Sequence, residues 1–198
     1  MTEMTEKRRA FIEISGERSS GKTGLILSEL AQATARREFC AVIDATDSFD
    51  PVSARNAGVD LNHILWICCT GKLDSALKAA DYILHAGGFS HVVLDICDIR
   101  PEIVARIPRS YWFRFRFATE KSGAVFLLIT PVPCSGAGSS AAVECVREKV
   151  EWSGSPEYRL LETVCARTLI RKAFRSAAMI KAGNRGITLE NILNSKHK

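Results

Sequence analysis

Residues 16–23 combine glycines and side chains that are suited to binding phosphate groups. They read Gly-Glu-Arg-Ser-Ser-Gly-Lys-Thr, which matches the pattern G-x-x-x-x-G-K-[ST] at every position. In this pattern the glycines let the backbone curl, so that its N–H groups point at phosphate oxygens. Lys22 would reach the β- and γ-phosphates, and the Thr23 hydroxyl would bind Mg²⁺. The sequence therefore predicts a binding loop for ATP and Mg²⁺ that is formed by Gly16, Glu17, Arg18, Ser19, Ser20, Gly21, Lys22 and Thr23.

An acidic residue suited to the same metal ends another apolar run. Residues 91–95 read His-Val-Val-Leu-Asp, and Asp95 at the end of such a strand would hold Mg²⁺ through water molecules. Many strands end in Asp without binding a metal, but the complete phosphate-binding pattern favours this assignment. The four histidines and seven cysteines show no ligand spacing, so we expect no zinc site.

Apolar runs alternate with amphipathic stretches along the chain, which is typical of an α/β fold. The apolar runs are rich in Ile, Val, Leu and Phe, as expected for parallel strands that are covered on both faces. The expected fold is therefore a mostly parallel sheet flanked by helices, with the phosphate-binding loop between the first strand and the first helix. We expect strands at residues 11–14, 39–43, 64–68, 92–95 and 124–129, and helices at 22–36, at 73–86 and within 110–121.

The C-terminal third is expected to extend this sheet. Residues 131–138 contain two prolines and two glycines and predict a flexible loop. Residues 141–152 and 166–172 predict added antiparallel edge strands.

Residues 111–117 fit two different structures. They read Tyr-Trp-Phe-Arg-Phe-Arg-Phe, and this alternation of aromatic and basic residues is typical of a strand. A helix would instead bring Phe113 beside Phe117. Arginines contact phosphates and aromatic rings stack on bases, so the segment is a candidate site for single-stranded DNA. Equally, the aromatic residues could belong to the core, with the arginines as a solvated face. The candidate residues for DNA binding are Arg106, Arg109, Tyr111, Trp112, Arg114 and Arg116.

Two segments resemble the bacterial recombinase RecA, namely residues 14–23 and 40–60. Residues 107–117 and 128–134 are more narrowly similar to the RecA-related ImuA family of bacterial mutagenesis cassettes. Proteins of that family accompany an inactive polymerase homologue and an error-prone polymerase. The resemblance implies a RecA-like P-loop fold and an ATP-binding role in DNA repair, the SOS response and translesion synthesis. The partners it implies are single-stranded DNA, a DNA polymerase or its inactive homologue, and RecA or further copies of the chain.

The same resemblance identifies positions at which this chain differs from RecA. RecA has a glutamate after its second strand that activates the attacking water, and the matching residue here is Thr46. A neutral hydroxyl is no such base, and the substitute Asp47 lies one residue further along. Pro131 replaces a glutamine that senses the γ-phosphate. Ser53 replaces a tyrosine that stacks on adenine, while Asp50, which meets the adenine amino group, is retained. These differences predict ATP binding with weak or absent hydrolysis.

The composition is that of an ordinary globular protein, with 46% hydrophobic and 25% charged residues. No apolar run approaches the roughly 20 residues of a membrane span, and residues 1–10 lack the apolar core of a signal peptide. We therefore expect a cytoplasmic protein without a membrane contact.

The net charge is +5, and residues 167–198 contain eight Lys or Arg and one acidic residue, which suits nucleic acid or an acidic partner. The expected organisation is a polar lead at residues 1–10, one domain at 11–175 and a mobile basic tail at 176–198.

Three functions remain open from the sequence. The favoured one is an ATP-binding accessory protein of DNA repair that bridges DNA and a polymerase partner. The first alternative is an active DNA-dependent ATPase of the recombinase type. The second is a small-molecule P-loop kinase, which would usually show an arginine-rich lid over the phosphates.

Overall fold

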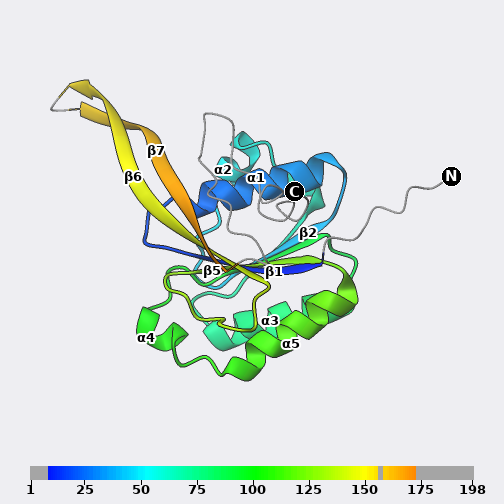
Figure 1. The fold of residues 1–198 in the computed structure, drawn as a ribbon. Helices are drawn as coiled ribbons and strands as arrows, with labels where there is room; N and C mark the ends of the chain where they lie inside the picture. Colours follow the sequence, from blue (N-terminus) through cyan, green and yellow to red (C-terminus); the bar gives the residue numbers. More distant parts are fainter. Residues whose placement is uncertain (1–8, 156–157, 173–198) are drawn as a thin grey trace, which may run out of the picture.

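The apolar runs form a single sheet at the centre of the molecule. The computed structural model describes residues 9–155 and 158–172. Within them, seven strands lie in the order β3-β2-β4-β5-β1-β6-β7 (Figure 1). Every residue of the first, second and fifth strands is buried, as predicted from their nearly unbroken apolar sequences. The strands are β1 Ala10–Ser15, β2 Cys40–Asp44, β3 Ile64–Cys68, β4 His91–Asp95, β5 Val125–Thr130, β6 Ala141–Ser155 and β7 Tyr158–Lys172.

Helices cover both faces of this sheet. In Figure 1, α1 and α2 lie above the sheet, and α3, α4 and α5 lie below it. Each face has its own buried apolar cluster, because alternate residues of every strand point to opposite sides. The helices are α1 Lys22–Ala35, α2 Pro51–Asn56, α3 Leu73–Ala86, α4 Pro101–Val104 and α5 Arg109–Ser122, with a short 3₁₀ helix, η1, at Leu61–His63. Among the described residues, no helix has the length and apolar character needed to cross a membrane.

The edge of the sheet beyond β1 corrects one prediction. The six strands from β3 to β6 all run parallel, and β6 joins the sheet parallel to β1 rather than antiparallel. Only β7, the hairpin partner of β6, runs antiparallel to its neighbour. The direction of β6 follows from residues 131–140, which return beneath the sheet to the start of β1, where Ser140 N–H donates to the Phe11 carbonyl oxygen at 2.7 Å. Only Ala141–Glu144 pair with β1, and the rest of the β6–β7 hairpin extends away from the helices (Figure 1).

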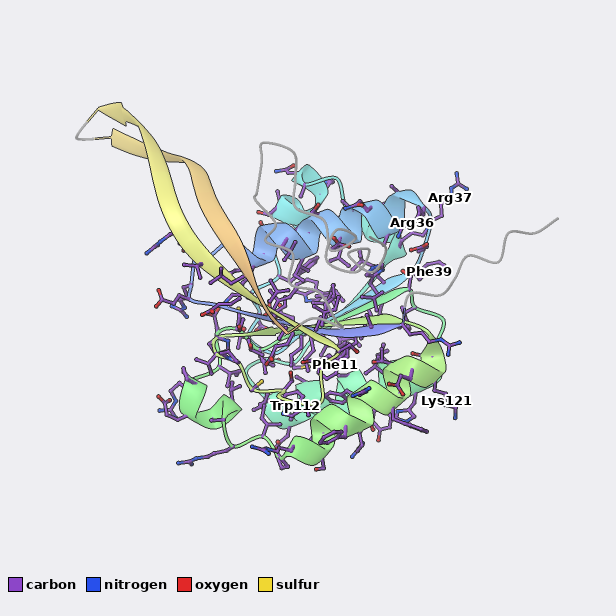
Figure 2. All side chains as sticks on the ribbon, viewed as in Figure 1. Phe11, Arg36, Arg37, Phe39, Trp112 and Lys121 are labelled. Carbon is purple, nitrogen blue, oxygen red and sulfur yellow. The ribbon has the colours of Figure 1, made fainter. Side chains whose placement is uncertain are left out.

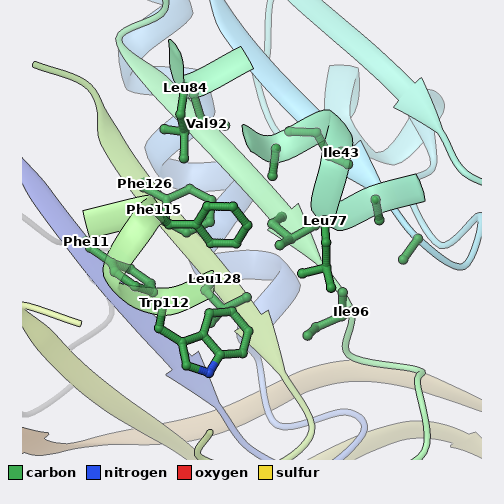
Figure 3. Close-up of a cluster of buried hydrophobic side chains, with 14 of the residues drawn as sticks. Phe11, Ile43, Leu77, Leu84, Val92, Ile96, Trp112, Phe115, Phe126 and Leu128 are labelled. Atoms are coloured by element: carbon green, nitrogen blue, oxygen red, sulfur yellow. The ribbon is translucent and has the colours of Figure 1, made fainter. Parts of the chain in front are cut away.

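Residues 111–117 are helical, which settles the ambiguity between strand and helix. They form the first half of α5, with Trp112 and Phe115 on its buried side. Figure 3 shows both side chains within the cluster that also contains Phe11 and Phe126. The Phe115 ring meets the Phe126 ring edge-on at a centroid distance of 5.3 Å. Packing against the sheet therefore outweighs the local strand preference of these aromatic residues. The predicted tail, residues 176–198, lies outside the described residues.

Candidate functional site

The phosphate-binding pattern forms the connection between β1 and α1, as predicted. The backbone turns through left-handed conformations at Ser19 (φ 57°) and at Gly21 (φ 87°), immediately before α1 begins at Lys22. Gly16 passes so close to β6 that a Cβ atom there would clash with the Cys145 carbonyl oxygen. The first glycine of the pattern is therefore required by packing as well as by the shape of the loop.

The side chain of Lys22, the first residue of α1, reaches back into this loop. This side chain is buried, and its ammonium group donates to the Gly16 carbonyl oxygen and, at 3.3 Å, to the Thr130 carbonyl oxygen. The Ser20 hydroxyl of the same loop is buried and has no hydrogen-bond partner. A cation and an unpaired donor inside a glycine-rich turn fit a phosphate group, because both would gain an oxygen acceptor. Thr23 is exposed on the first turn of α1, where its hydroxyl is accessible to a metal ion.

The ends of the parallel strands bring acidic residues to the same edge of the sheet as the loop. Asp95 ends β4, and its register partner on β2 is Asp44. The Asp95 carboxylate accepts from Cys97 N–H at 2.9 Å and from the Ser48 hydroxyl at 3.3 Å. Burial raises the pKa of Asp95, and the nearby Asp44 carboxylate raises it further. A partly buried carboxylate with a raised pKa is stabilised by a divalent cation, so Asp95 fits the predicted Mg²⁺ role together with Thr23.

Asp44 has a structural role that the sequence alone did not assign. Burial on its own would raise the pKa of this carboxyl group. N–H groups of the following turn outweigh that effect, and the pKa of Asp44 is lowered. The carboxylate accepts from Phe49 N–H at 2.8 Å and from Thr46 and Ser48 N–H at 3.1 Å each. Asp44 therefore sets the path of residues 45–49, where RecA-type proteins are expected to carry their catalytic base.

Thr46 and Asp47 occupy that turn in different ways. The Thr46 hydroxyl is buried and has no hydrogen-bond partner. Asp47 adopts a left-handed conformation with φ 59°, and its carboxylate accepts from the Cys68 thiol at 2.6 Å. Cys68 ends β3, on the side of β2 away from β4 and β1. Asp47 thus turns toward the edge of the sheet, away from the phosphate-binding loop.

Two further predicted residues are held by specific partners. Arg18 forms an ion pair at 2.8 Å with Asp98, which links the loop to the segment after β4. Asp50 is the N-cap of α2 and accepts from Val52 N–H at 3.1 Å and Ser53 N–H at 3.0 Å. The proposed adenine contact of Asp50 thus involves a carboxylate that already caps a helix.

Glu13 is a buried acidic residue that the sequence analysis missed. It lies in the middle of β1 with 2% of its surface exposed. One carboxylate oxygen accepts from Cys134 N–H at 2.6 Å and Ser135 N–H at 2.9 Å, and the other accepts from the Ser135 hydroxyl at 2.8 Å. The loop of residues 131–138, predicted to be flexible, is therefore anchored to the strand that leads into the phosphate-binding loop. A carboxylate inside an apolar strand was the available signal, but its partners lie more than a hundred residues away.

The candidate DNA-binding residues do not form one exposed site. Trp112 is 1% exposed, so its indole ring is not available to stack on a base, which corrects the prediction for this residue. Tyr111 is partly buried, with the Arg114 guanidinium 5.5 Å from its ring centroid. Arg114 is ion-paired with Asp81 of α3, and Arg116 is ion-paired with Glu120 at 3.0 Å. Arg106 and Arg109 are exposed near the start of α5, on the face of the sheet opposite α1.

Comparison with protein families matches residues 5–107 to the RecA N-terminal domain. Among curated proteins, the chain is 37% identical over 103 residues to the RecA protein of Acidiphilium cryptum, an alignment that covers 52% of this chain and 28% of that protein. It is 39% identical over 88 residues to the RecA protein of Borrelia duttonii, covering 44% of this chain and 24% of that protein. The chain thus spans about a quarter of the length of these curated relatives.

Among solved structures, the chain is similar to a KaiC-like protein from the archaeon Pyrococcus horikoshii. The TM-score is 0.55 at 15% sequence identity, and the alignment covers 87% of this chain and 83% of that one. At this level of identity the likeness concerns the fold alone.

Proposed function

Because the chain belongs to the RecA N-terminal domain family, we propose that this RecA-like ATP-binding domain is an accessory factor of DNA repair that binds ATP and hydrolyses it very slowly. ATP with Mg²⁺ is the typical ligand of RecA-like P-loop domains. In this chain, Lys22 and the loop N–H groups would hold the phosphates, while Thr23 and Asp95 would hold the metal. Mg²⁺, when bound, neutralises phosphate charge.

The observation that carries the proposal of slow hydrolysis is the turn after β2. Thr46 cannot take a proton from water at neutral pH, and Asp47 is directed toward Cys68 on β3. Pro131, at the position of the expected γ-phosphate sensor, has no side-chain donor or acceptor. Loss of general-base catalysis typically lowers a rate by about 10²–10⁴-fold. Nucleotide binding would then serve mainly to hold one conformation of the domain.

Two segments of the chain suggest the setting of this role. The similarity of residues 107–117 and 128–134 to the ImuA family supports a place in translesion synthesis, beside a DNA polymerase or an inactive polymerase homologue. Residues 128–134 include the end of β5, whose Thr130 carbonyl oxygen accepts from Lys22. The same proposal includes three further contacts: with single-stranded DNA, with RecA and between copies of the chain.

The test is to measure ATP affinity and ATP turnover together, with and without single-stranded DNA. Wild type is expected to bind MgATP, and Lys22→Ala to bind it at least tenfold more weakly, or about 1.4 kcal/mol. Lys78→Ala, which removes an exposed lysine from α3, is the matched control and should bind as wild type does. Equal affinity of wild type and Lys22→Ala would refute the assignment of the loop.

The turnover measurement separates the proposal from the main alternative. We expect slow hydrolysis that single-stranded DNA hardly changes. Fast hydrolysis stimulated by DNA would establish an active ATPase, with the base supplied by Glu17, which is exposed in the loop, or by a neighbouring subunit. Transfer of phosphate to a small metabolite would instead establish the kinase alternative.

A further inference from the structure

Four exposed side chains follow one another at four-residue spacing along α5: Arg109, Phe113, Phe117 and Lys121. In a helix this spacing places them on one ridge. Phe113 is 52% exposed and Phe117 is 66% exposed. We call these four residues the α5 ridge. Its centre is aromatic and each end carries a cation.

The α5 ridge is not needed to dock the helix on the sheet. The opposite side of α5 buries Trp112, Phe115, Ala118 and Thr119 against the sheet and the neighbouring loop. Figure 2 shows this division, with Trp112 directed into the molecule and Lys121 directed away from it. Two adjacent phenylalanines on the outer side remain in contact with water, which is unfavourable unless another molecule covers them.

The charges on α5 restrict what that molecule can be. Among the described residues, Arg109 and Lys121 have no ion pair, whereas Arg114 and Arg116 are paired with Asp81 and Glu120. A second copy of the same ridge would bring like charges together, because the cations flank the phenylalanines on both sides. A partner with carboxylates around an apolar centre would complement the ridge.

We propose that the α5 ridge is the docking surface for an acidic amphipathic helix of a partner protein. Apolar side chains of that helix would pack on either side of Phe113 and Phe117, as ridges of one helix pack into grooves of another. Its carboxylates would meet Arg109 and Lys121 at the rim. Single-stranded DNA fits less well, because Trp112 and Phe115 are buried and the arginines beside the ridge are already neutralised.

The position of the α5 ridge makes this inference independent of nucleotide binding. Helix α5 lies on one face of the sheet, and α1 and α2 lie on the other face (Figure 1). A partner on the ridge would leave the phosphate-binding loop accessible. The inference can therefore fail while the proposed ATP binding holds, and the reverse is also true.

The experiment uses the full chain and a defined probe. The probe is a fluorescein-labelled synthetic helix with leucines on one face and Glu or Asp elsewhere, followed by fluorescence anisotropy. Wild type is expected to bind this peptide and to bind two control peptides much more weakly, one with the leucines dispersed around the helix and one with Lys in place of Glu and Asp. Phe113→Ser combined with Phe117→Ser should weaken binding about tenfold or more, the size typical of losing hot-spot side chains.

A matched control and a second variant keep the test decisive. Phe39→Ser removes another exposed phenylalanine, 56% exposed, which lies beyond the end of α1 on the other face of the sheet from α5 (Figure 2), and it should leave binding unchanged. Arg109→Glu combined with Lys121→Glu retains both phenylalanines and should also weaken binding. If the circular dichroism of the double serine variant shows that it has lost its helices, the charge-reversal variant serves as the test in its place.

Three results would overturn the inference. The first is the absence of peptide binding, or equal binding by wild type and the ridge variants. The second is binding of a labelled oligo-dT strand that the ridge variants lose, which would assign the surface to DNA. The third is self-association of wild type in sedimentation that the ridge variants abolish, which would assign it to a second copy.

Discussion

Replacing Glu13 tests whether the loop of residues 131–138 is held by one buried carboxylate. Glu13→Gln keeps the size of the side chain but replaces a charged acceptor by a neutral amide. Glu13→Leu removes the acceptor altogether. Because Glu13 is buried and accepts three hydrogen bonds, both variants are expected to destabilise the fold, and Glu13→Leu more strongly.

The expected losses follow from those hydrogen bonds. In Glu13→Gln, one oxygen can still accept from the Cys134 and Ser135 N–H groups, while bonds to a charged acceptor become bonds to a neutral one. The relief of burying a charge offsets part of this loss, so the net cost should be about 1–2 kcal/mol. In Glu13→Leu, one buried and one partly buried N–H group lose their acceptor at about 1–3 kcal/mol each, for a total of about 2–6 kcal/mol. Domains of this kind have about 5–15 kcal/mol of stability in all, so the second variant should lose a large part of it.

Urea unfolding measures both free energies, and native-state hydrogen exchange at Cys134 and Ser135 locates the effect. The two amides should exchange much faster in Glu13→Leu, while amides of β2 should change only as much as global stability does. A Glu13→Leu variant within about 0.5 kcal/mol of wild type would refute the reasoning, since it would mean that the loop finds other acceptors.

Three further predictions concern the strand ends, the crossover loop and the catalytic turn. Asp95→Asn should raise the melting temperature at neutral pH without Mg²⁺, because burial raises the pKa of Asp95 and its ionised form opposes folding. This gain should shrink in melts at progressively lower pH, as the wild-type carboxyl group takes up a proton. Gly138→Ala should cost about 1–3 kcal/mol in urea unfolding, since its Cβ would lie 2.5 Å from the Trp112 Cβ, whereas Gly24→Ala, with open space around it on α1, should not destabilise the fold. Thr46→Glu should raise ATP turnover in a single-turnover assay, and an unchanged rate would show that the turn does not face the γ-phosphate.

The parts of the fold that were predictable depend on local signals. The phosphate-binding loop was placed correctly because eight consecutive residues carry its pattern between a strand and a helix. The five central strands were placed to within a residue or two, because strands buried on both faces are continuous apolar runs. The short helix α2 was missed, although Asp50 followed by Pro51 is a recognisable helix start.

The parts that were not predictable depend on contacts between distant residues. Residues 111–117 have the period of a strand, and only the sheet beneath Trp112 and Phe115 makes them helical. The direction of β6 is set by the return of residues 131–140 beneath β1, which no local pattern specifies. Likewise, Asp47 has the right chemistry for a base, and its left-handed backbone conformation turns it toward Cys68.

The strand order has a consequence for how the protein is assembled during synthesis. The neighbours of β1 in the sheet are β5 and β6, although β1 is made first and β2, β3 and β4 form a contiguous set of strands on their own. While the ribosome is still translating the segment up to β4, β1 has no strand to pair with. The phosphate-binding loop at its end can therefore reach its final shape only after β5 has emerged and entered the sheet between β4 and β1. A nascent chain arrested before Val125 should thus be unable to retain ATP, however complete its glycine-rich loop is in sequence.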